Sequence, residues 1–291
     1  MALFELSGGD ELTEWHSFVV GIDPWIDAGH AAGSAIAELR GQFDMRLVAA
    51  WDSEALIDYR SRRPTMRIVD GVNTELRWPR IELLGGKDAK GTNFLLLVGP
   101  EPDMRWQEFC RSVAQLARDF GIEQAVGLGA FPAPVPHTRP TQVTSSANDK
   151  RLAGNVGFLP GDWEVPAGIM GAMEHAFAAV SIAAIGVWAR VPHYWAQFPY
   201  PPAVVRLLDA LVQMEGPEVD TRRWQQETVA INANIAELVA QEGLEVLIAR
   251  LEEQYDLGLE QGQQVFDLPT GEEIAARVEE FLRDEGGNPA S

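Results

Sequence analysis

The polar side chains best placed to do chemistry follow directly after four apolar runs of the sequence. They are Asp23, Trp25 and Asp27, then Glu101, then His137, Thr138 and Arg139, and finally His193 with Tyr194. Short apolar runs of this kind predict buried strands. Because the carboxyl ends of parallel strands meet at one edge of an open sheet, we expect these residues to line one crevice. Such a crevice would hold acids, an arginine, two histidines and aromatic walls, which suits a small-molecule site.

The first histidine of this set lies in a stretch of unusual composition, from Gly127 to Pro140. Two glycines there can adopt backbone angles that other residues avoid, and four prolines cannot continue a helix or a central strand. We therefore expect a rigid loop after a strand that ends near Ala130. His137 is the most suggestive residue of this loop, since a histidine held in a rigid loop can titrate near neutral pH.

Several of these residues also have a purely structural explanation. Asp27 is well placed to cap a helix expected from about His30 to Arg40. Glu101 precedes another expected helix, whose dipole favours an acid at that end. Arg139 could simply pair with Asp23 or Glu101. The histidines could likewise be packing residues or part of an aromatic contact between subunits.

Familiar catalytic and cofactor motifs are missing from the sequence. It contains no Gly-x-Ser-x-Gly elbow, no His-Glu-x-x-His pair and no His/Asp cluster at metal-ligand spacing. Gly127-Leu128-Gly129 is half of a dinucleotide fingerprint and runs into prolines, while Gly85-Gly86-Lys87 lacks the spacing of a phosphate loop and predicts a turn. We expect no cofactor, no metal, no assignable catalytic residue and, on balance, no enzymatic activity.

Composition narrows the choice of partners. The 291 residues carry a net charge of -20, which disfavours nucleic acid and anionic membranes because like charges repel. Cys110 is the only cysteine, so an internal disulfide is excluded, and its helical surroundings favour a buried packing thiol. The first residues lack the basic and apolar regions of a signal peptide, and no apolar window is long enough to span a bilayer. A cytoplasmic location is the expectation.

The remaining periodicity predicts an α/β fold with a mixed sheet. Apolar runs predict six strands, and amphipathic or small-residue segments alternate with them as helices. The strands are expected at 15–22, 46–51, 93–99, 122–130, 141–146 and 180–189, and the helices at 30–40, 104–120, 168–179 and 201–214. Residues 65–69 and 74–83 alternate polar with apolar side chains around a turn at 70–73, which predicts a hairpin at the edge of the sheet. The segment 149–165 is expected to be irregular.

Beyond Pro217 the composition changes. Residues 218–291 include 17 acidic and 5 basic side chains, a net charge of -12. A long amphipathic helix is expected over 221–255 and a shorter one over 271–282, capped by Thr270. We therefore divide the chain into an α/β body, 1–217, and an acidic helical extension, 218–291. The extension must pack its apolar stripe on the body or on a neighbouring subunit.

In several segments the chain resembles the actinobacterial branch of the proteasome-assembly-chaperone family, related to the second of the paired eukaryotic assembly chaperones. The similar segments are Val20-Gly21-Ile22 with Asp27-Ala28-Gly29, Gly127 to Ala130, Val135 to Pro140, and the helical tail with Trp224. This resemblance implies a three-layer α/β/α, Rossmann-like body of the phosphorylase/hydrolase kind. It also implies homo-oligomers, with a trimer as the plausible form.

Two functions from different classes are consistent with these features. The first is a cytosolic, oligomeric protein-interaction or assembly factor, whose acidic tail could recruit a basic protein partner. The second is a small-molecule-binding protein, or a hydrolase- or phosphorylase-like enzyme, that uses the crevice at the strand ends. The absence of a catalytic motif favours the first.

Overall fold

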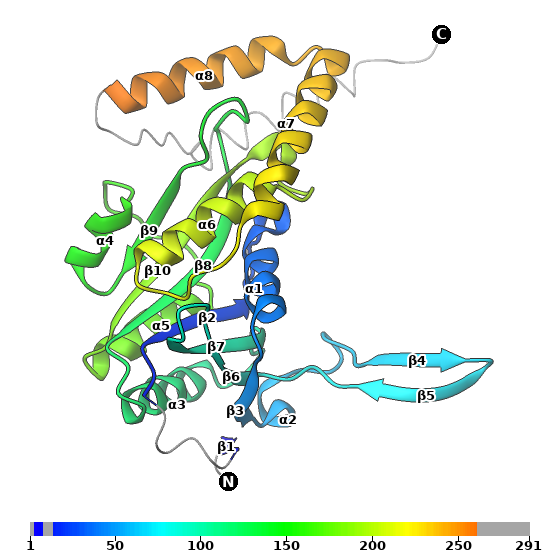
Figure 1. The fold of residues 1–291 in the computed structure, drawn as a ribbon, viewed down its shortest axis with the longest axis vertical. Helices are drawn as coiled ribbons and strands as arrows, with labels where there is room; N and C mark the ends of the chain where they lie inside the picture. The colour runs from blue at the N-terminus through cyan, green and yellow to red at the C-terminus, as the bar shows by residue number, and fades with distance from the viewer. Residues whose placement is uncertain (1–2, 8–13, 261–291) are drawn as a thin grey trace, which may run out of the picture.

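An eight-stranded mixed sheet organises the fold in the computed structural model, which describes residues 3–7 and 14–260 (Figure 1). The strand order is β1-β3-β6-β7-β2-β8-β10-β9, and the four adjacent strands β7, β2, β8 and β10 run parallel. The remaining pairings are antiparallel. The strands are β1 (Phe4–Leu6), β2 (Ser17–Asp23), β3 (Arg46–Trp51), β6 (Glu82–Lys87), β7 (Asn93–Pro100), β8 (Gln124–Ala133), β9 (Val143–Ala147) and β10 (Ala183–Pro192).

Both faces of the sheet are covered, so the predicted three-layer α/β/α architecture is confirmed. On strand β2, Val19 packs into one apolar cluster, whereas Phe18 and Val20 pack into the other. Such two-sided burial explains why the central strands read as continuous apolar runs. One face carries α1 (Ala31–Gln42), α6 (Pro201–Gln213), α7 (Arg222–Glu242) and α8 (Glu245–Glu260), and the other carries α3 (Trp106–Asp119) and α5 (Ile169–Ala179).

The predicted hairpin is present, but it is not at the edge of the sheet. Strands β4 (Thr65–Val69) and β5 (Val72–Arg77) form a separate two-stranded sheet that projects from the body (Figure 1). Its turn is the dipeptide Asp70-Gly71, with φ of 51° and 82°, as a two-residue hairpin turn requires. The expected position at the edge of the main sheet was therefore wrong. An alternating pattern indicates exposed strands but does not indicate which strands they pair with.

Two sequence expectations about strand limits are also corrected. Gly85, Gly86 and Lys87 belong to strand β6, where they pair with β7, and do not form a turn. Glycine suits position 85 because a bulkier residue would collide with the Trp15 ring. Strand β8 continues past Ala130 to Ala133 despite Pro132. Beyond Gly127, strand β8 pairs with β10 on one side, and on the other side it makes only a single bridge, between Asp27 and Ala130. This part of β8 therefore resembles an edge strand, in which proline is tolerated.

The helices beyond β9 differ from the expectation in detail. The long run over 221–255 is two helices, because Gly243 adopts a left-handed conformation with φ 66° and ends α7. A short helix, α4 (Lys150–Val156), lies in the segment expected to be irregular, and Asp149 caps it. The helix expected over 271–282 lies outside the described residues. Within 14–260, none of the helices has the length and apolar character needed to cross a membrane.

The remaining short elements complete the chain. They are α2 (Ser53–Leu56) and the 3-10 turns η1 (Ala28–His30) and η2 (His193–Trp195). Strands β2 and β3 flank α1 as expected, although β6 and β7 lie between them in the sheet. Cys110 lies on the buried face of α3, and burial raises the pKa of its thiol to about 12. A neutral thiol at physiological pH agrees with the packing role expected for it.

Candidate functional site

The four groups of polar residues follow strands that end at one edge of the sheet. Strands β2, β7, β8 and β10 are parallel neighbours, so the loops after Asp23, Pro100, Ala133 and Pro192 leave from the same side. At this edge, however, the side chains bind different partners and do not form one cluster.

The acids Asp27 and Glu101 bind helix N-termini. The Asp27 carboxylate accepts hydrogen bonds from the amides of Ala32 and Gly33 at 2.8 and 2.9 Å, which satisfies the first turn of α1. Glu101 accepts from the Ile169 amide at 2.7 Å. The helix that it caps is therefore α5 and not the following helix, α3, as we expected from the sequence. Cap carboxylates are occupied by backbone donors, which leaves them poorly placed as bases.

His137 and Tyr194 form a buried pair. The Tyr194 hydroxyl accepts from the His137 backbone amide at 2.8 Å and lies 2.9 Å from ring atom Nδ1. The hydroxyl thus contacts both the backbone and the ring of His137. Burial lowers the pKa of His137, partly offset by the charge of Glu252. Burial therefore favours the neutral form of the imidazole.

Arg139 and Thr138 hold the last described helix against the loop. The Arg139 guanidinium donates to both carboxylate oxygens of Asp256 at 2.9 and 2.7 Å and to Glu252 at 3.1 Å. Thr138 donates to the same Glu252. The acids that pair with Arg139 therefore come from α8, and the sequence expectation of Asp23 or Glu101 was wrong. A forked pair of this kind is geometrically specific.

Of the other expected site residues, Asp23 and Trp25 are exposed to solvent, whereas His193 contacts Tyr194. Trp25 is 63% exposed, and Asp23 is exposed at the end of β2. The His193 ring lies 3.4 Å from the Ala133 carbonyl and packs edge-on against Tyr194. These contacts of His193 lie within one chain, whereas the sequence suggested an aromatic contact between subunits.

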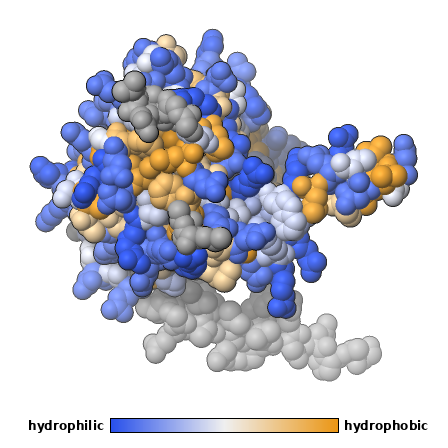
Figure 2. Space-filling view, turned by 90° about the horizontal axis from the view of Figure 1, so that it is seen from below, coloured by the Kyte–Doolittle hydropathy of each residue, from blue (hydrophilic) through white to orange (hydrophobic). Residues whose placement is uncertain are grey.

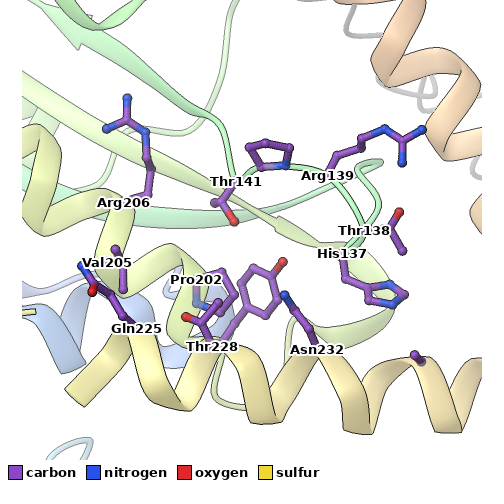
Figure 3. Close-up of a pocket in the computed structure, with 13 residues that line it drawn as sticks. His137, Thr138, Arg139, Thr141, Pro202, Val205, Arg206, Gln225, Thr228 and Asn232 are labelled. Atoms are coloured by element: carbon purple, nitrogen blue, oxygen red, sulfur yellow. The ribbon is translucent and has the colours of Figure 1, made fainter. Parts of the chain in front are cut away.

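A pocket of about 600 Å³ opens beside the His137 loop, between that loop, the start of α6 and the exposed side of α7 (Figure 3). Of the nine expected site residues, three line it. Its lining is His137, Thr138, Arg139, Pro140, Thr141, Tyr200, Pro202, Val205, Arg206, Gln225, Thr228, Asn232 and Ala236. Asp23, Trp25, Asp27, Glu101, His193 and Tyr194 are not among these residues, so the nine do not share this pocket.

The pocket holds polar groups that the described chain leaves unsatisfied. His137 Nε2 and Asn232 Oδ1 are buried and have no hydrogen-bond partner among residues 3–7 and 14–260. Buried polar atoms of this kind usually have one. Arg206 forms no ion pair within the same residues. An imidazole nitrogen, an amide oxygen and a guanidinium can together bind a polar or anionic small molecule, but they supply no nucleophile.

The α6 and α7 residues of the pocket were not expected from the sequence. Gln225, Thr228 and Asn232 are spaced by three and four positions, and therefore share one face of α7. The spacing of these polar residues could have indicated the pocket, but a helix face that is simply exposed to solvent has the same pattern. No group of three or more His, Cys, Asp or Glu side chains within the described ranges could hold a metal ion.

Replacing Arg139 by methionine is expected to loosen α8. The methionine keeps most of the apolar stem but loses the bonds to Asp256 and Glu252, so amide hydrogen exchange in α8 should become several-fold faster. Arg151→Met is the matched control, because Arg151 pairs with its near neighbour Asp149. Unchanged exchange in α8, or equal effects of the two variants, would show that these ion pairs do not hold the helix.

Comparison with known proteins identifies the family. The sequence matches the PAC2 family over residues 21–239, so the chain belongs to that family. The resemblance to the proteasome-assembly-chaperone family seen in the sequence is thereby confirmed. Searching the curated proteins gave no significant match.

Solved structures agree with this assignment. A Mycobacterium tuberculosis protein of unknown function is 32% identical, with a TM-score of 0.80 over 89% of this chain and 90% of that one. A proteasome-assembly chaperone homologue from the same organism is 33% identical, with a TM-score of 0.72 over 77% and 95%. A PAC2 family protein from Streptomyces avermitilis is 30% identical, with a TM-score of 0.71 over 81% and 99%.

Proposed function

We propose that this protein is a cytosolic protein-interaction or assembly factor, related in role to proteasome assembly chaperones, and that it acts as a homo-oligomer, with a trimer as the expected form. The observation that carries the proposal is its family membership, together with 33% identity to a proteasome-assembly chaperone homologue over 77% of the chain. A shared fold alone would not support a shared role.

The chemistry at the strand ends supports a non-enzymatic role. Asp27 and Glu101 are engaged as helix caps, Arg139 is engaged with α8, and His137 is paired with Tyr194. An enzyme of the hydrolase or phosphorylase kind needs an activated nucleophile or a base directed at substrate. These residues instead join the loops to the helices around them.

Two measurements test the proposal. Light scattering of the full chain at micromolar concentration should give the mass of an oligomer, with a trimer expected. Mixing the chain with proteasome subunits from its own source should give a complex that co-elutes, or faster assembly of those subunits. A monomer that neither binds these subunits nor affects their assembly would refute the assembly role.

The pocket favours a second candidate function, the binding of a small molecule. His137 Nε2, Asn232 Oδ1 and Arg206 can recognise a carboxylate or phosphate that also carries a hydrogen-bonding group. We expect such a ligand to raise the melting temperature of the wild-type chain, and Arg206→Met to abolish the rise. Arg118→Met, on the exposed side of α3, is the control and should respond as the wild type does. A panel of anionic metabolites without any shift would argue against this function.

A further inference from the structure

The β4–β5 hairpin, which we call the arm and define as residues 60–80, is exposed along its whole length between Thr65 and Trp78. An isolated two-stranded hairpin is at best marginally stable in water. Figure 2 shows the arm standing clear of the body, with hydrophobic residues among hydrophilic ones. A segment built in this way buries little within its own chain.

The arm exposes apolar side chains. Met66 and Leu76 lie directly opposite each other in the hairpin, and Ile68 lies two residues further along β4, beyond a register shift. These three side chains are 50%, 43% and 58% exposed. At the base, Trp78 packs edge-on against Tyr59 with ring centres 4.7 Å apart. Contiguous exposed apolar side chains indicate a protein-binding surface.

The charge of the arm is opposite to that of the rest of the chain. Residues 60–80 contain six arginines and two acids, a net charge of +4, so the remainder of this -20 chain carries -24. Three of the arginines, Arg60, Arg63 and Arg67, form no ion pair within the described residues. The rest of the chain is therefore opposite in charge to the arm.

The acidic counterpart lies on the outer side of α7 and α8. Glu237, Glu242, Glu245 and Glu253 are exposed and form no ion pair within residues 3–7 and 14–260. Val246, between them, is 66% exposed. The two helices therefore offer unpaired carboxylates with an apolar side chain among them, which matches the arm in both charge and apolar character.

The arm cannot meet this surface in its own chain. Figure 1 shows the arm projecting beside β3 and β6, whereas α8 lies at the opposite end of the molecule. A contact between these surfaces must therefore join two copies, either reciprocally in a dimer or head to tail. Successive head-to-tail contacts close into a ring when a rotation relates the copies.

We propose that the arm of one copy docks on the α7–α8 surface of a second copy. This proposal rests on the homo-oligomer proposed above and names the surfaces that build it. The positive charge of the arm, to which Arg60, Arg63 and Arg67 contribute, attracts the unpaired glutamates of the neighbour, while Met66, Ile68 and Leu76 cover apolar surface.

Charge reversal in the full chain tests the contact. The arm variant Arg60→Glu, Arg63→Glu, Arg67→Glu and the helix variant Glu237→Lys, Glu242→Lys, Glu245→Lys should each weaken self-association at least about tenfold, as judged by light scattering over a concentration series. Combining all six substitutions in one chain should restore it. The control Arg40→Glu, Arg111→Glu, Arg118→Glu makes the same charge change as the arm variant elsewhere on the surface and should associate like the wild type.

Cross-linking tests the contact with the charges of the arm unchanged, in case charge reversal unfolds the hairpin. Val72→Cys at the arm tip and Val246→Cys on α8 place accessible thiols in a chain whose own Cys110 is buried. A short bismaleimide should link the two variants to each other when they are mixed, and should not link either one to itself.

The outcomes separate the two proposals. A wild-type chain that is monomeric at every concentration overturns both the oligomer and the arm contact. An oligomer that survives arm reversal overturns the arm contact alone. Arm reversal that abolishes association without rescue by the helix variant overturns α7–α8 as the docking surface. A monomeric wild type that binds RNA through the arm arginines would show a nucleic-acid site in place of a self-contact.

Discussion

Glu174→Gln is expected to stabilise the protein relative to the wild type at pH 8 and to change its stability little at pH 4.5. Glu174 lies on α5, where burial raises the pKa of its carboxyl to about 7. Hydrogen bonds from the Ser146 hydroxyl and the Gly186 amide lower this pKa but do not offset burial. Glutamine carries no charge and can still accept the Ser146 bond, which spans 2.7 Å.

The direction in which stability changes with pH follows from the folded-state and ordinary pKa values of Glu174. The folded-state pKa, about 7, lies above the ordinary value of 4.5, so folding favours the protonated carboxyl. Wild-type stability is therefore retained below pH 4.5 and lost as the pH rises through 7. A shift of that size corresponds to at most about 3 kcal/mol. The difference in unfolding free energy between variant and wild type should grow over this window and then level off.

Ser146→Ala is the companion variant. Removing the hydroxyl takes away a donor that favours the ionised form, which should raise the pKa of Glu174 further and move the stability loss to higher pH. In the Glu174→Gln background, the same substitution should cost an amount that does not vary with pH. Urea unfolding from pH 4.5 to 8.5 measures all four chains. A pH-independent difference between Glu174→Gln and the wild type would mean that Glu174 is ionised without penalty.

The layers of the fold were predictable from the sequence because they depend on local patterns. Residues 93–99 read as a central strand since both faces of β7 are buried, and α3 was recognisable from its apolar spacing. The partner of Arg139 was not predictable in this way. Asp256 lies 117 positions away in the sequence, and local spacing cannot indicate which of the many carboxylates folds back onto the loop.

The same limit affected the two glycines of the His137 region. We expected Gly127 and Gly129 to supply unusual backbone angles before a loop. Neither has a positive φ, and both lie inside β8. Their role is to leave space: Met170 packs over Gly127, and the Trp188 ring packs over Gly129. A glycine selected for space and one selected for its backbone angle are identical in a sequence, and only the side chains packed over them in the fold distinguish them.

Gly129→Ala is consequently expected to destabilise the protein by about 2–3 kcal/mol, through overpacking. The new Cβ would lie 2.3 Å from Cε3 and 2.4 Å from Cζ3 of Trp188. Trp188 is directly opposite Gly129 in the parallel ladder, and its indole donates to Ser146 at 3.2 Å. The rigid ring can move only as a whole, which would also break this hydrogen bond.

Gly127→Ala is the matched comparison, on the same strand and two residues away. Its Cβ would meet the end of the Met170 side chain, with Sδ at 1.7 Å and Cε at 2.2 Å. That thioether can rotate away, so we expect a smaller loss of about 1 kcal/mol. In a double-mutant cycle, Trp188→Leu should recover at least about 1 kcal/mol of the Gly129→Ala loss and none of the Gly127→Ala loss. Equal losses for the two glycines, or strict additivity with Trp188→Leu, would place the cost in the backbone of β8 and not in the space beneath the indole.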